Sequence, residues 1–420
     1  MPIKKPRGVP DILPGETDRW QHLERVVREL AHVYGYQEIR TPIFEFTELF
    51  QRGVGEGTDI VAKEMYTFND RRGRSLSLRP EGTAAVVRAF IENNMYTWPQ
   101  PVKLYYIGPM FRYDRPQAGR YRQFHQFGAE VFGSTEPGVD AEVIELLLRF
   151  YKILGLKGLS LEISSVGCPE CRKELTDSLV SYIRPQTAGL CKDCRDRVDR
   201  NPLRLLDCKE PGCKELLREA PTPLDFLCLS CSAHFAALRQ ELLALKISYN
   251  INPHMVRGLD YYTGTSFEVI LPGIGAQSAI GAGGRYDNLV KTCGGPPTPG
   301  VGFAVGIERT LLALEEQGIE FSGDTQPGVF VVAVGEDAVR HALRILQALR
   351  EAGIRADRDH ANRGLKAQLK QAHRRGVKWV VIVGEEELSR GTAALRAMDT
   401  GEQVEVNESE LIPRLRAWRA

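Results

Sequence analysis

Arginines crowd one short segment of the sequence, YYIGPMFRYDRPQAGRYRQFHQFGAEVFG (residues 105–133). β-rich runs flank these arginines, so the pattern predicts a hairpin with a charged loop. A guanidinium presents a fixed fork of donors that matches phosphate oxygens and stabilises charge developing at phosphorus. The loop is therefore a candidate clamp for a triphosphate, although a solvated surface loop would have the same composition. The arginines of the loop are Arg112, Arg115, Arg120 and Arg122.

Polar residues also mark one face of the second run of this hairpin. Gln126, Gly128 and Glu130 recur at period two, so in a strand all three face the same side. A glutamine and a glutamate beside a glycine are not typical of a core. They predict a polar floor for a binding site.

Two further segments place a charged residue at the expected start of a helix. SLRPEGTAAVVRAF (77–90) predicts a helix that begins at Pro80, with Glu81 in its first turn. A carboxylate there either stabilises the helix or recognises an ammonium group. GVGFAVGIERTLLAL (300–314) predicts a strand that turns into a helix, with Arg309 in the first turn. A positive charge at that position opposes the helix dipole, which favours a functional role.

Two more segments combine charge, aromatic rings and glycine. MVRGLDYYTGTSFEV (255–269) places Arg257 and two tyrosines directly before a strand. GAGGRYD (281–287) offers a backbone almost free of side chains, which permits the close approach of a flat ligand or tight strand packing.

Eight of the nine cysteines form four close pairs, three of them with the spacing C-x-x-C. Such pairs are typical of tetrahedral zinc knuckles and predict two structural metal sites. Reduced pairs and disulfides remain open alternatives, the latter mainly in a hyperthermophile. Cys293 stands alone and is expected to serve packing. The pairs are Cys168 with Cys171, Cys191 with Cys194, Cys208 with Cys213, and Cys228 with Cys231.

The elements that must position these residues follow from hydrophobic periodicity. Residues 17–34 predict an amphipathic helix whose apolar stripe runs from Trp20 to Tyr34. Short β-rich runs then predict a sheet, interrupted by about 80 residues that hold the paired cysteines and helical stretches. The strands are expected at 103–108, 127–133, 160–167, near 247–253 and at 265–273, with a helix at 306–318.

Beyond a polar linker at 318–328, strands and helices alternate. We expect a strand at 329–334, a helix with Val339, Leu343, Leu346 and Leu349 on one face, a strand at 354–358, a helix at 363–377, a strand at 379–383 and two later strands. Residues 340–378 within this part are rich in lysine and arginine. Such a stretch is usually a solvated face, but it is also a candidate for polyanion binding.

Composition is that of an ordinary globular protein of two or three domains. The 420 residues are 43% hydrophobic and 26% charged, with a net charge of +1, so contact with a polyanion must come from local patches. The N-terminus lacks the apolar stretch of a secretory signal, and no run approaches the roughly 18 apolar residues of a membrane span. We therefore expect a cytoplasmic protein with no membrane partner.

These segments together resemble the class II aminoacyl-tRNA synthetases, and among them the histidyl-tRNA synthetase family, over nearly the whole chain. Residues 111–126 and 300–309 are similar to the second and third motifs of the class, and the segment ending at Thr41 and Pro42 is similar to the first, which forms the dimer interface in the family. Residues 257–268 and 281–287 resemble two signatures of the histidyl enzymes. RPEGTA (79–84) resembles a third.

The resemblance implies a role for each candidate residue. Arg112 would hold the α-phosphate of ATP, Arg120 would help with the phosphates, and Arg309 would hold the far end of a bent triphosphate. Arg257 would contact the α-phosphate and the substrate carboxylate. For histidine, it implies Glu81 and Thr83 at the α-amino group, Gln126 as a further contact, Glu130 and Tyr262 at the imidazole nitrogens, and Tyr286 closing the pocket. Arg115 and Gln117 would meet the acceptor end of the tRNA.

The fold class implied is an α+β catalytic domain over residues 1–325, with a mostly antiparallel sheet flanked by helices. A cysteine-rich, mainly helical insertion lies at about 168–245, and a C-terminal α/β anticodon-binding domain covers 326–420. The activity implied is ATP-dependent activation of histidine, with Mg²⁺, and transfer of the histidyl group to tRNA(His) by a homodimer. Because the family needs no zinc for catalysis, a metal in the insertion would be structural and dispensable to the chemistry.

Two other functions are compatible with such a core. One is a non-catalytic paralogue that regulates the first enzyme of histidine biosynthesis, but it lacks the C-terminal domain. The other is a class II synthetase for another amino acid, which would not need Glu130 and Tyr262 around an imidazole.

Overall fold

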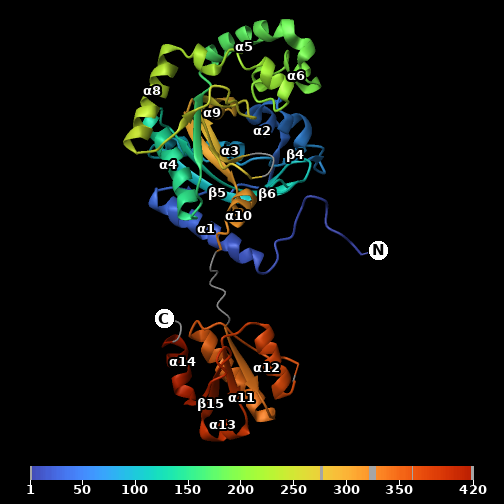
Figure 1. The fold of residues 1–420 in the computed structure, drawn as a ribbon, viewed down its shortest axis with the longest axis vertical. Helices are drawn as coiled ribbons and strands as arrows, with labels where there is room; N and C mark the ends of the chain where they lie inside the picture. Colours follow the sequence, from blue (N-terminus) through green and yellow to red (C-terminus); the bar gives the residue numbers. More distant parts are fainter. Residues whose placement is uncertain (1, 275–277, 321–327, 362, 418–420) are drawn as a thin grey trace. The chain divides into compact units, whose positions relative to one another are not determined.

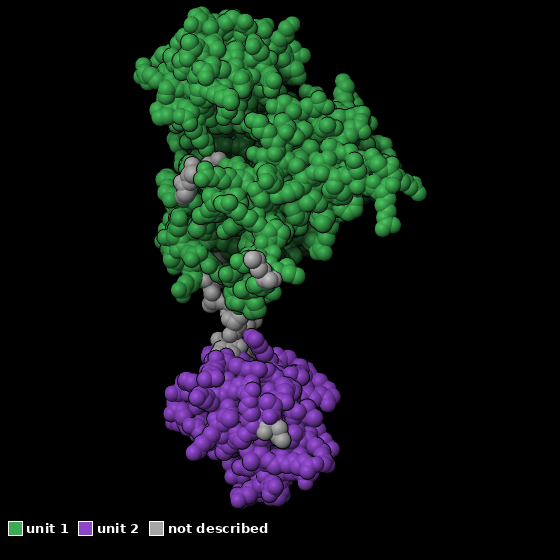
Figure 2. Space-filling view, turned by 90° about the vertical axis from the view of Figure 1, so that its right-hand side faces the viewer, with its two compact units in different colours: residues 1–321 green, residues 322–420 purple. Residues whose placement is uncertain are grey.

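The computed structural model describes residues 2–274, 278–320, 328–361 and 363–417. It divides into two compact units, residues 1–321 and 322–420, which Figure 1 shows as a ribbon and Figure 2 in two colours. Each unit has hydrophobic cores of its own. Among the described residues, no helix is long and apolar enough to cross a membrane.

A mixed sheet of eight strands forms the centre of the first unit. The edge pairs β1–β5 and β7–β8 are parallel, and the pairs between them are antiparallel. This confirms the predicted mostly antiparallel sheet. In sheet order the strands are β1 (Gln37–Glu38), β5 (Val102–Phe111), β6 (Gln123–Phe132), β11 (Gly300–Gly306), β10 (Ala279–Arg285), β9 (Thr263–Ile270), β7 (Ser160–Ser165) and β8 (Asn250–Ile251).

The largest core joins this sheet to four helices. Along β6, Phe127, Ala129 and Val131 enter this core, so the alternate residues of the strand lie on the opposite face. The first helix brings its predicted stripe into the same core, with Leu23 and Leu30 buried, which confirms the amphipathic prediction. The helices are α1 (Glu16–Val33), α4 (Pro137–Ile153), α8 (Leu229–Ala244) and α10 (Ile307–Glu316).

A second core of the unit lies around α3 (Thr83–Glu92) and α9 (Leu289–Thr292), against β5 and the tyrosines that follow residue 260. A small antiparallel sheet in the order β2 (Phe44–Phe46), β4 (Ser75–Leu78), β3 (Thr67–Asn69) stands beside it. The remaining turns here are α2 (Thr47–Phe50), η1 (Gln51–Gly55), η2 (Ile60–Glu64) and η3 (Met95–Thr97).

The cysteine-rich insertion is mainly helical, as predicted, and lies at the end of the unit opposite α1 (Figure 1). Its core is small, and it includes three cysteine side chains among a few leucines. The elements before α8 are α5 (Pro169–Ile183), η4 (Arg184–Gly189), α6 (Lys192–Arg197), η5 (Pro202–Leu205), α7 (Pro211–Leu216) and η6 (Pro223–Phe226).

The second unit is an α/β domain, which confirms the predicted class. Its sheet has the order β13 (Ala356–Arg358), β12 (Val329–Ala333), β14 (Trp379–Val383), β15 (Thr392–Ala397), β16 (Gln403–Asn407). The first three strands are parallel, and the last two are antiparallel to their neighbours. Its helices are α11 (Glu336–Glu351), α12 (Leu365–Arg374), α13 (Glu385–Arg390) and α14 (Glu408–Ala417).

The structure corrects two local predictions. The helix expected from Pro80 begins at Thr83, because the Glu81 carboxylate accepts the backbone N–H groups of Thr83 and Ala84 from outside the helix. On α11 the predicted Leu346 and Leu349 are buried, and Ala338, Ala342 and Ile345 complete the buried stripe. Leu343 is rotated away from that stripe and exposed.

Candidate active site

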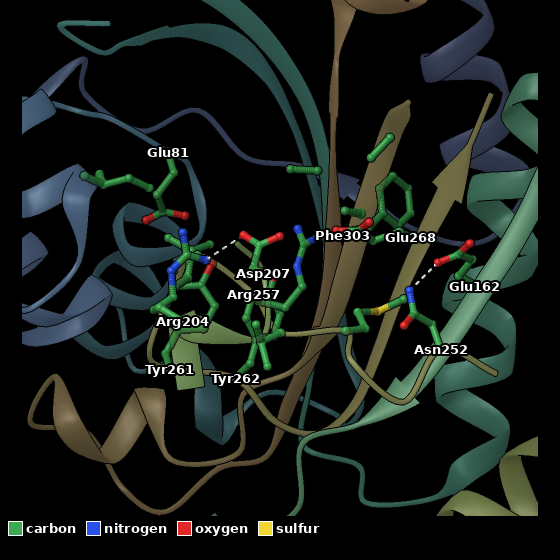
Figure 3. Close-up of a pocket in the computed structure, with 18 of the residues that line it drawn as sticks. Glu81, Glu162, Arg204, Asp207, Asn252, Arg257, Tyr261, Tyr262, Glu268 and Phe303 are labelled. Carbon is green, nitrogen blue, oxygen red and sulfur yellow. Dashed lines mark hydrogen bonds and ion pairs between the residues drawn. The ribbon is translucent and has the colours of Figure 1, made fainter. Parts of the chain in front are cut away.

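A cavity of about 760 Å³ opens over the face of the main sheet that β6 turns away from the large core (Figure 3). Strands β6, β11, β10 and β9 contribute residues to its wall. Gln126 and Glu130, which the sequence predicts as a polar floor, both line this cavity. The predicted site residues that line the cavity are Glu81, Thr83, Arg112, Arg120, Gln126, Glu130, Arg257, Tyr262 and Tyr286.

Glu130 is the most deeply buried acid of the cavity, with 1% of its surface exposed. Thr83 Oγ1 donates to it at 2.7 Å, and the Tyr286 hydroxyl donates to its other oxygen. Burial raises the pKa of Glu130 to about 8, although these donors oppose the shift. The cavity thus presents a buried hydrogen-bonding carboxyl group whose two oxygens are held by Thr83 and Tyr286.

Glycine in the neighbouring strand makes room for this side chain. Gly302 pairs with Glu130 across β11 and β6, and a Cβ atom on Gly302 would lie 1.9 Å from Glu130 Oε2. Gly300 has a similar role, because its Cβ would lie 2.3 Å from the Tyr286 ring. The glycines of β11 therefore leave the space that the Glu130 carboxyl group and the Tyr286 ring occupy.

Glu81 provides a second buried carboxylate, 4% exposed, at the start of α3. It accepts the N–H groups of Thr83 at 2.7 Å and Ala84 at 2.8 Å. Burial raises the pKa of Glu81, and these hydrogen bonds oppose the rise. Helix stabilisation thus accounts for part of its role, and its place in the cavity wall leaves it available to a cation as well.

Arg257 forms an ion pair with Glu268 inside the cavity (Figure 3). Its guanidinium also stands over the Tyr262 ring, 5.7 Å from the centroid. Burial lowers the pKa of Arg257, but Glu268 together with Tyr262 and Tyr261 raises the pKa above the ordinary value. A fully charged fork of donors is therefore held in place by the protein itself.

Three arginines gather where the cavity meets a smaller hollow of about 180 Å³. Arg112 and Arg120 line both spaces, and Arg309 lines the smaller one. Arg112 donates to Pro80 O at 2.9 Å, and Arg309 donates to Ala279 O at 2.8 Å. Burial lowers the pKa of Arg309, and so does the nearby charge of Arg120. An anion among these guanidinium groups would relieve their mutual repulsion.

The structure does not bring Arg115 and Gln117 into this cavity. Both are exposed in the loop between β5 and β6, where Gln117 and Arg120 exchange backbone hydrogen bonds of 3.0 and 2.9 Å. They remain at the tip of the hairpin, accessible to a large ligand.

Several lining residues were not predicted from the sequence. Glu268 is one, and its signal is a lone charge in an otherwise uncharged strand; Glu162, its neighbour across β7 and β9, is another. The segment around Arg204 and Asp207, which are paired at 3.3 Å, also reaches the cavity from the insertion (Figure 3). No local pattern could have indicated that contact.

The eight paired cysteines converge into two groups of four. Within each group the sulfur atoms all lie within 4.8 Å of one another. All nine cysteines are free thiols. The geometry allows metal binding at both groups. The groups are Cys168, Cys171, Cys228 and Cys231, and Cys191, Cys194, Cys208 and Cys213.

Comparisons with known proteins cover both units. A family model described as histidyl-tRNA synthetase matches residues 8–180 and 213–310, and one described as anticodon binding domain matches residues 328–418. A histidine–tRNA ligase of Desulforamulus reducens is 56% identical over 417 residues, 99% of this chain and 100% of the relative. One of Pelotomaculum thermopropionicum is 56% identical over 416 residues, 99% of this chain and 98% of the relative.

A solved structure gives the same result in three dimensions. The crystal structure of apo histidyl-tRNA synthetase from S. aureus superposes with a TM-score of 0.84 at 43% identity. The match covers 98% of this chain and 99% of that one.

Glu130→Gln tests the buried carboxyl group. Between the ordinary pKa of 4.5 and a native pKa of about 8, the folded protein holds a proton that the unfolded chain releases. The stabilising contribution is complete below the lower pKa and is lost as the pH rises through the upper one. We expect wild type to lose about 1.4 kcal/mol of unfolding free energy per pH unit relative to the variant in this window. Urea unfolding of both proteins between pH 4.5 and 8 measures this difference in unfolding free energy. Parallel pH profiles for the two proteins would contradict the prediction.

Proposed function

The chain belongs to the histidyl-tRNA synthetase family, and from that premise we propose how its residues activate histidine with ATP and pass the histidyl group to tRNA(His). The observation that carries the proposal is one cavity with a buried hydrogen-bonding carboxyl group, Glu130, at its floor and a cluster of guanidinium groups at its rim. The buried carboxyl group suits a polar ring, and the cluster of guanidinium groups suits a triphosphate.

The imidazole of histidine binds between Glu130 and Tyr262. A neutral imidazole has one N–H donor and one acceptor nitrogen, so it needs an acceptor and a donor on opposite sides. Glu130 accepts from the N–H, and the Tyr262 hydroxyl donates to the other nitrogen. Tyr286, held against Glu130, closes the pocket.

The α-amino group of histidine binds near Glu81 and Thr83. Glu81 is a buried carboxylate in the cavity wall, and an ammonium group compensates a buried negative charge. Gln126, on the same strand face as Glu130, provides a further polar contact to the amino acid.

Arg112, Arg120 and Arg309 hold ATP. A histidine carboxylate oxygen attacks the α-phosphorus, the bond from that phosphorus to the bridging oxygen breaks, and pyrophosphate leaves with both electrons. The terminal ribose hydroxyl of the tRNA then attacks the histidyl carbonyl, and AMP leaves. Positioning and charge stabilisation supply most of such catalysis, which is why arginines and not nucleophiles dominate the site.

Arg257 acts on the attacking carboxylate and the α-phosphate together. Its ion pair with Glu268 and its contact with the Tyr262 ring fix the guanidinium before substrates bind. A fork of donors fixed in advance stabilises the charge that develops in the transition state without reorganisation at the moment of reaction.

Mg²⁺ bound together with ATP would neutralise phosphate charge. Glu162 and Glu268 are cross-strand neighbours on β7 and β9 and both line the cavity, so their oxygen atoms suit this ion. We also propose that the eight paired cysteines hold structural zinc, because they already converge as two sets of four thiols.

The two units divide the work on tRNA. We assign catalysis to residues 1–325, including the insertion at about 168–245, and anticodon contact to residues 326–420. Arg115 and Gln117 are exposed at the hairpin tip, where they can meet the acceptor end. The basic stretch 340–378 supplies phosphate contacts. Translation is the process that consumes charged tRNA, so the site of action is the cytoplasm.

A homodimer is supported by an exposed aromatic patch directly after Thr41 and Pro42. Phe44, Phe46 and Phe68 lie on the small three-stranded sheet, each with 44% to 50% of its surface exposed. Clustered apolar surface of this kind marks a contact with another chain.

The activation step predicts amino-acid-dependent exchange of pyrophosphate into ATP. We expect exchange with histidine alone among the twenty amino acids, because the pocket matches an imidazole. Exchange with another amino acid would keep the class and overturn the pocket. Absence of exchange with all of them would favour the regulatory paralogue.

Arg257→Ala tests the transition-state role. Removing a preorganised donor costs about 10²- to 10³-fold in kcat, and we expect that loss in exchange while the KM for histidine changes far less. Arg25→Ala, which removes an exposed arginine of α1 outside the cavity, is the control and should keep full exchange activity. Equal losses in kcat and histidine affinity for Arg257→Ala would show a binding residue.

Lys366→Ala with Lys370→Ala tests the second unit. Both lysines are exposed one turn apart on α12. We expect the KM for tRNA to rise several-fold and its salt dependence to weaken by about one unit of slope for each phosphate that a lysine no longer neutralises. Pyrophosphate exchange should stay unchanged. Arg414→Ala, exposed on α14 outside the basic stretch, is the control, and an equal effect there would contradict a localised RNA contact.

A further inference from the structure

The insertion carries two sets of cysteines that differ in their relation to the cavity. We call Cys191, Cys194, Cys208 and Cys213 the near tetrad, because Cys208 lines the cavity. Cys168, Cys171, Cys228 and Cys231 form the far tetrad, and none of these four lines it. The histidyl-tRNA synthetase family model leaves out residues 181–212, which hold three cysteines of the near tetrad.

Sulfur spacing identifies the kind of metal that fits. Four ligands about 2.3 Å from one zinc ion form a tetrahedron with edges of about 3.8 Å. Cys191 and Cys208 sulfurs lie 3.9 Å apart, and in the far tetrad Cys168 lies 3.4 Å from Cys171 and 4.0 Å from Cys228. These separations suit one ion per tetrad. A multi-iron cluster, which places several atoms between its cysteines, would hold the sulfurs farther apart.

Backbone groups already point at the sulfur atoms. Cys191 N–H donates to Cys213 Sγ at 3.2 Å, and Cys194 N–H donates to Cys191 Sγ at 3.4 Å. Donors of this kind orient thiolate ligands and stabilise their charge. The near tetrad is thus an oriented ligand set and not a chance gathering of side chains.

The near tetrad also fixes an otherwise weakly supported segment. Residues 198–217 contain two short helical turns and share a core of a few leucines with three of the four sulfurs. A core of this size stabilises little by itself, and small domains commonly need a metal to hold their fold. Removing the metal would therefore release this segment before the rest of the unit.

That segment is part of the cavity wall. Between Cys194 and the end of α7 it contributes three basic residues, Arg204, Lys209 and Lys214, against one acid, Asp207. Figure 3 shows Arg204 and Asp207 at the cavity. The wall is fastened to the catalytic body by Arg197 to Asp59 at 2.9 Å and by Asn201 to Asp260 at 3.1 Å. Its excess of positive charge faces a space that takes a polyanion.

We propose that the near tetrad binds Zn²⁺ and thereby holds residues 204–214 as a basic wall of the catalytic cavity that lowers the KM for ATP. The inference rests on the proposed function, since it takes the cavity as the ATP site. It also changes the expectation that metal in the insertion is dispensable. The cysteines are positioning residues, and Lys209 and Lys214 make the contacts.

The metal is tested without substrates. Elemental analysis of the full chain purified without chelator should give two zinc ions per chain, and Cys194→Ser with Cys213→Ser should retain one. Cobalt substitution should give the strong thiolate charge-transfer absorption of a tetrahedral S₄ site, halved in that variant. Cys293→Ser, outside both tetrads, should keep two ions. Iron, disulfides or metal-free thiols in the wild-type protein would overturn the assignment.

The wall is tested by kinetics of pyrophosphate exchange. We expect the near-tetrad variant to raise the KM for ATP about tenfold, and Lys209→Ala with Lys214→Ala to do the same while keeping both zinc ions. The lysine variant leaves the metal and the fold of the insertion in place. A normal KM for ATP in that variant would therefore contradict the proposed role of residues 204–214, even if the cysteine variant is unstable. Failure of all histidine-dependent exchange in wild type would instead overturn the proposed function and leave the zinc measurement standing.

Discussion

The burial of Glu130 is the constraint on which the site depends. A carboxyl group with almost no exposed surface requires donors on both oxygens and space in the adjacent strand. Thr83 and Tyr286 supply the donors, and Gly302 supplies the space. Thr83 lies on α3, Tyr286 directly follows β10, and Gly302 lies on β11. The burial of one side chain therefore brings three segments that are distant in the sequence to the same place. The polar floor and the glycine-rich strands are two aspects of this one requirement.

A buried ion pair holds the scaffold behind that floor. Asp140 on α4 is fully buried and pairs with Arg285 on β10 at 2.6 Å. Thr265 on β9 donates to Asp140 at 2.6 Å, and His234 on α8 contacts it at 2.8 Å. Removing one partner of such a pair leaves an uncompensated buried charge, which costs about 3 to 5 kcal/mol. The network therefore locks the insertion's last helix onto the strands that carry the cavity.

The insertion is therefore packed against the catalytic sheet and contributes to the cavity. Its last helix joins the main core, and the segment around Arg204 reaches the cavity. Basic residues of both parts line the cavity, Arg112 and Arg120 from the body and Arg204, Lys209 and Lys214 from the insertion. A small domain without a large core can hold such residues in register only if something stiffens it, and the convergence of four thiols provides the means.

The sequence by itself determined what local periodicity and residue type encode. It indicated the amphipathic helix α1, the period-two polar face of β6, the cysteine pairs, the alternating second unit and the family. It did not reveal the pairing of Arg257 with Glu268, the choice of which cysteine pairs share a tetrad, or the approach of residues 204–214 to the cavity. Those facts depend on distances between residues far apart in the chain, and these distances are set only when the sheet closes and the insertion docks. Periodicity specifies which face of a helix or strand is buried. Tertiary packing alone decides which other element that face contacts.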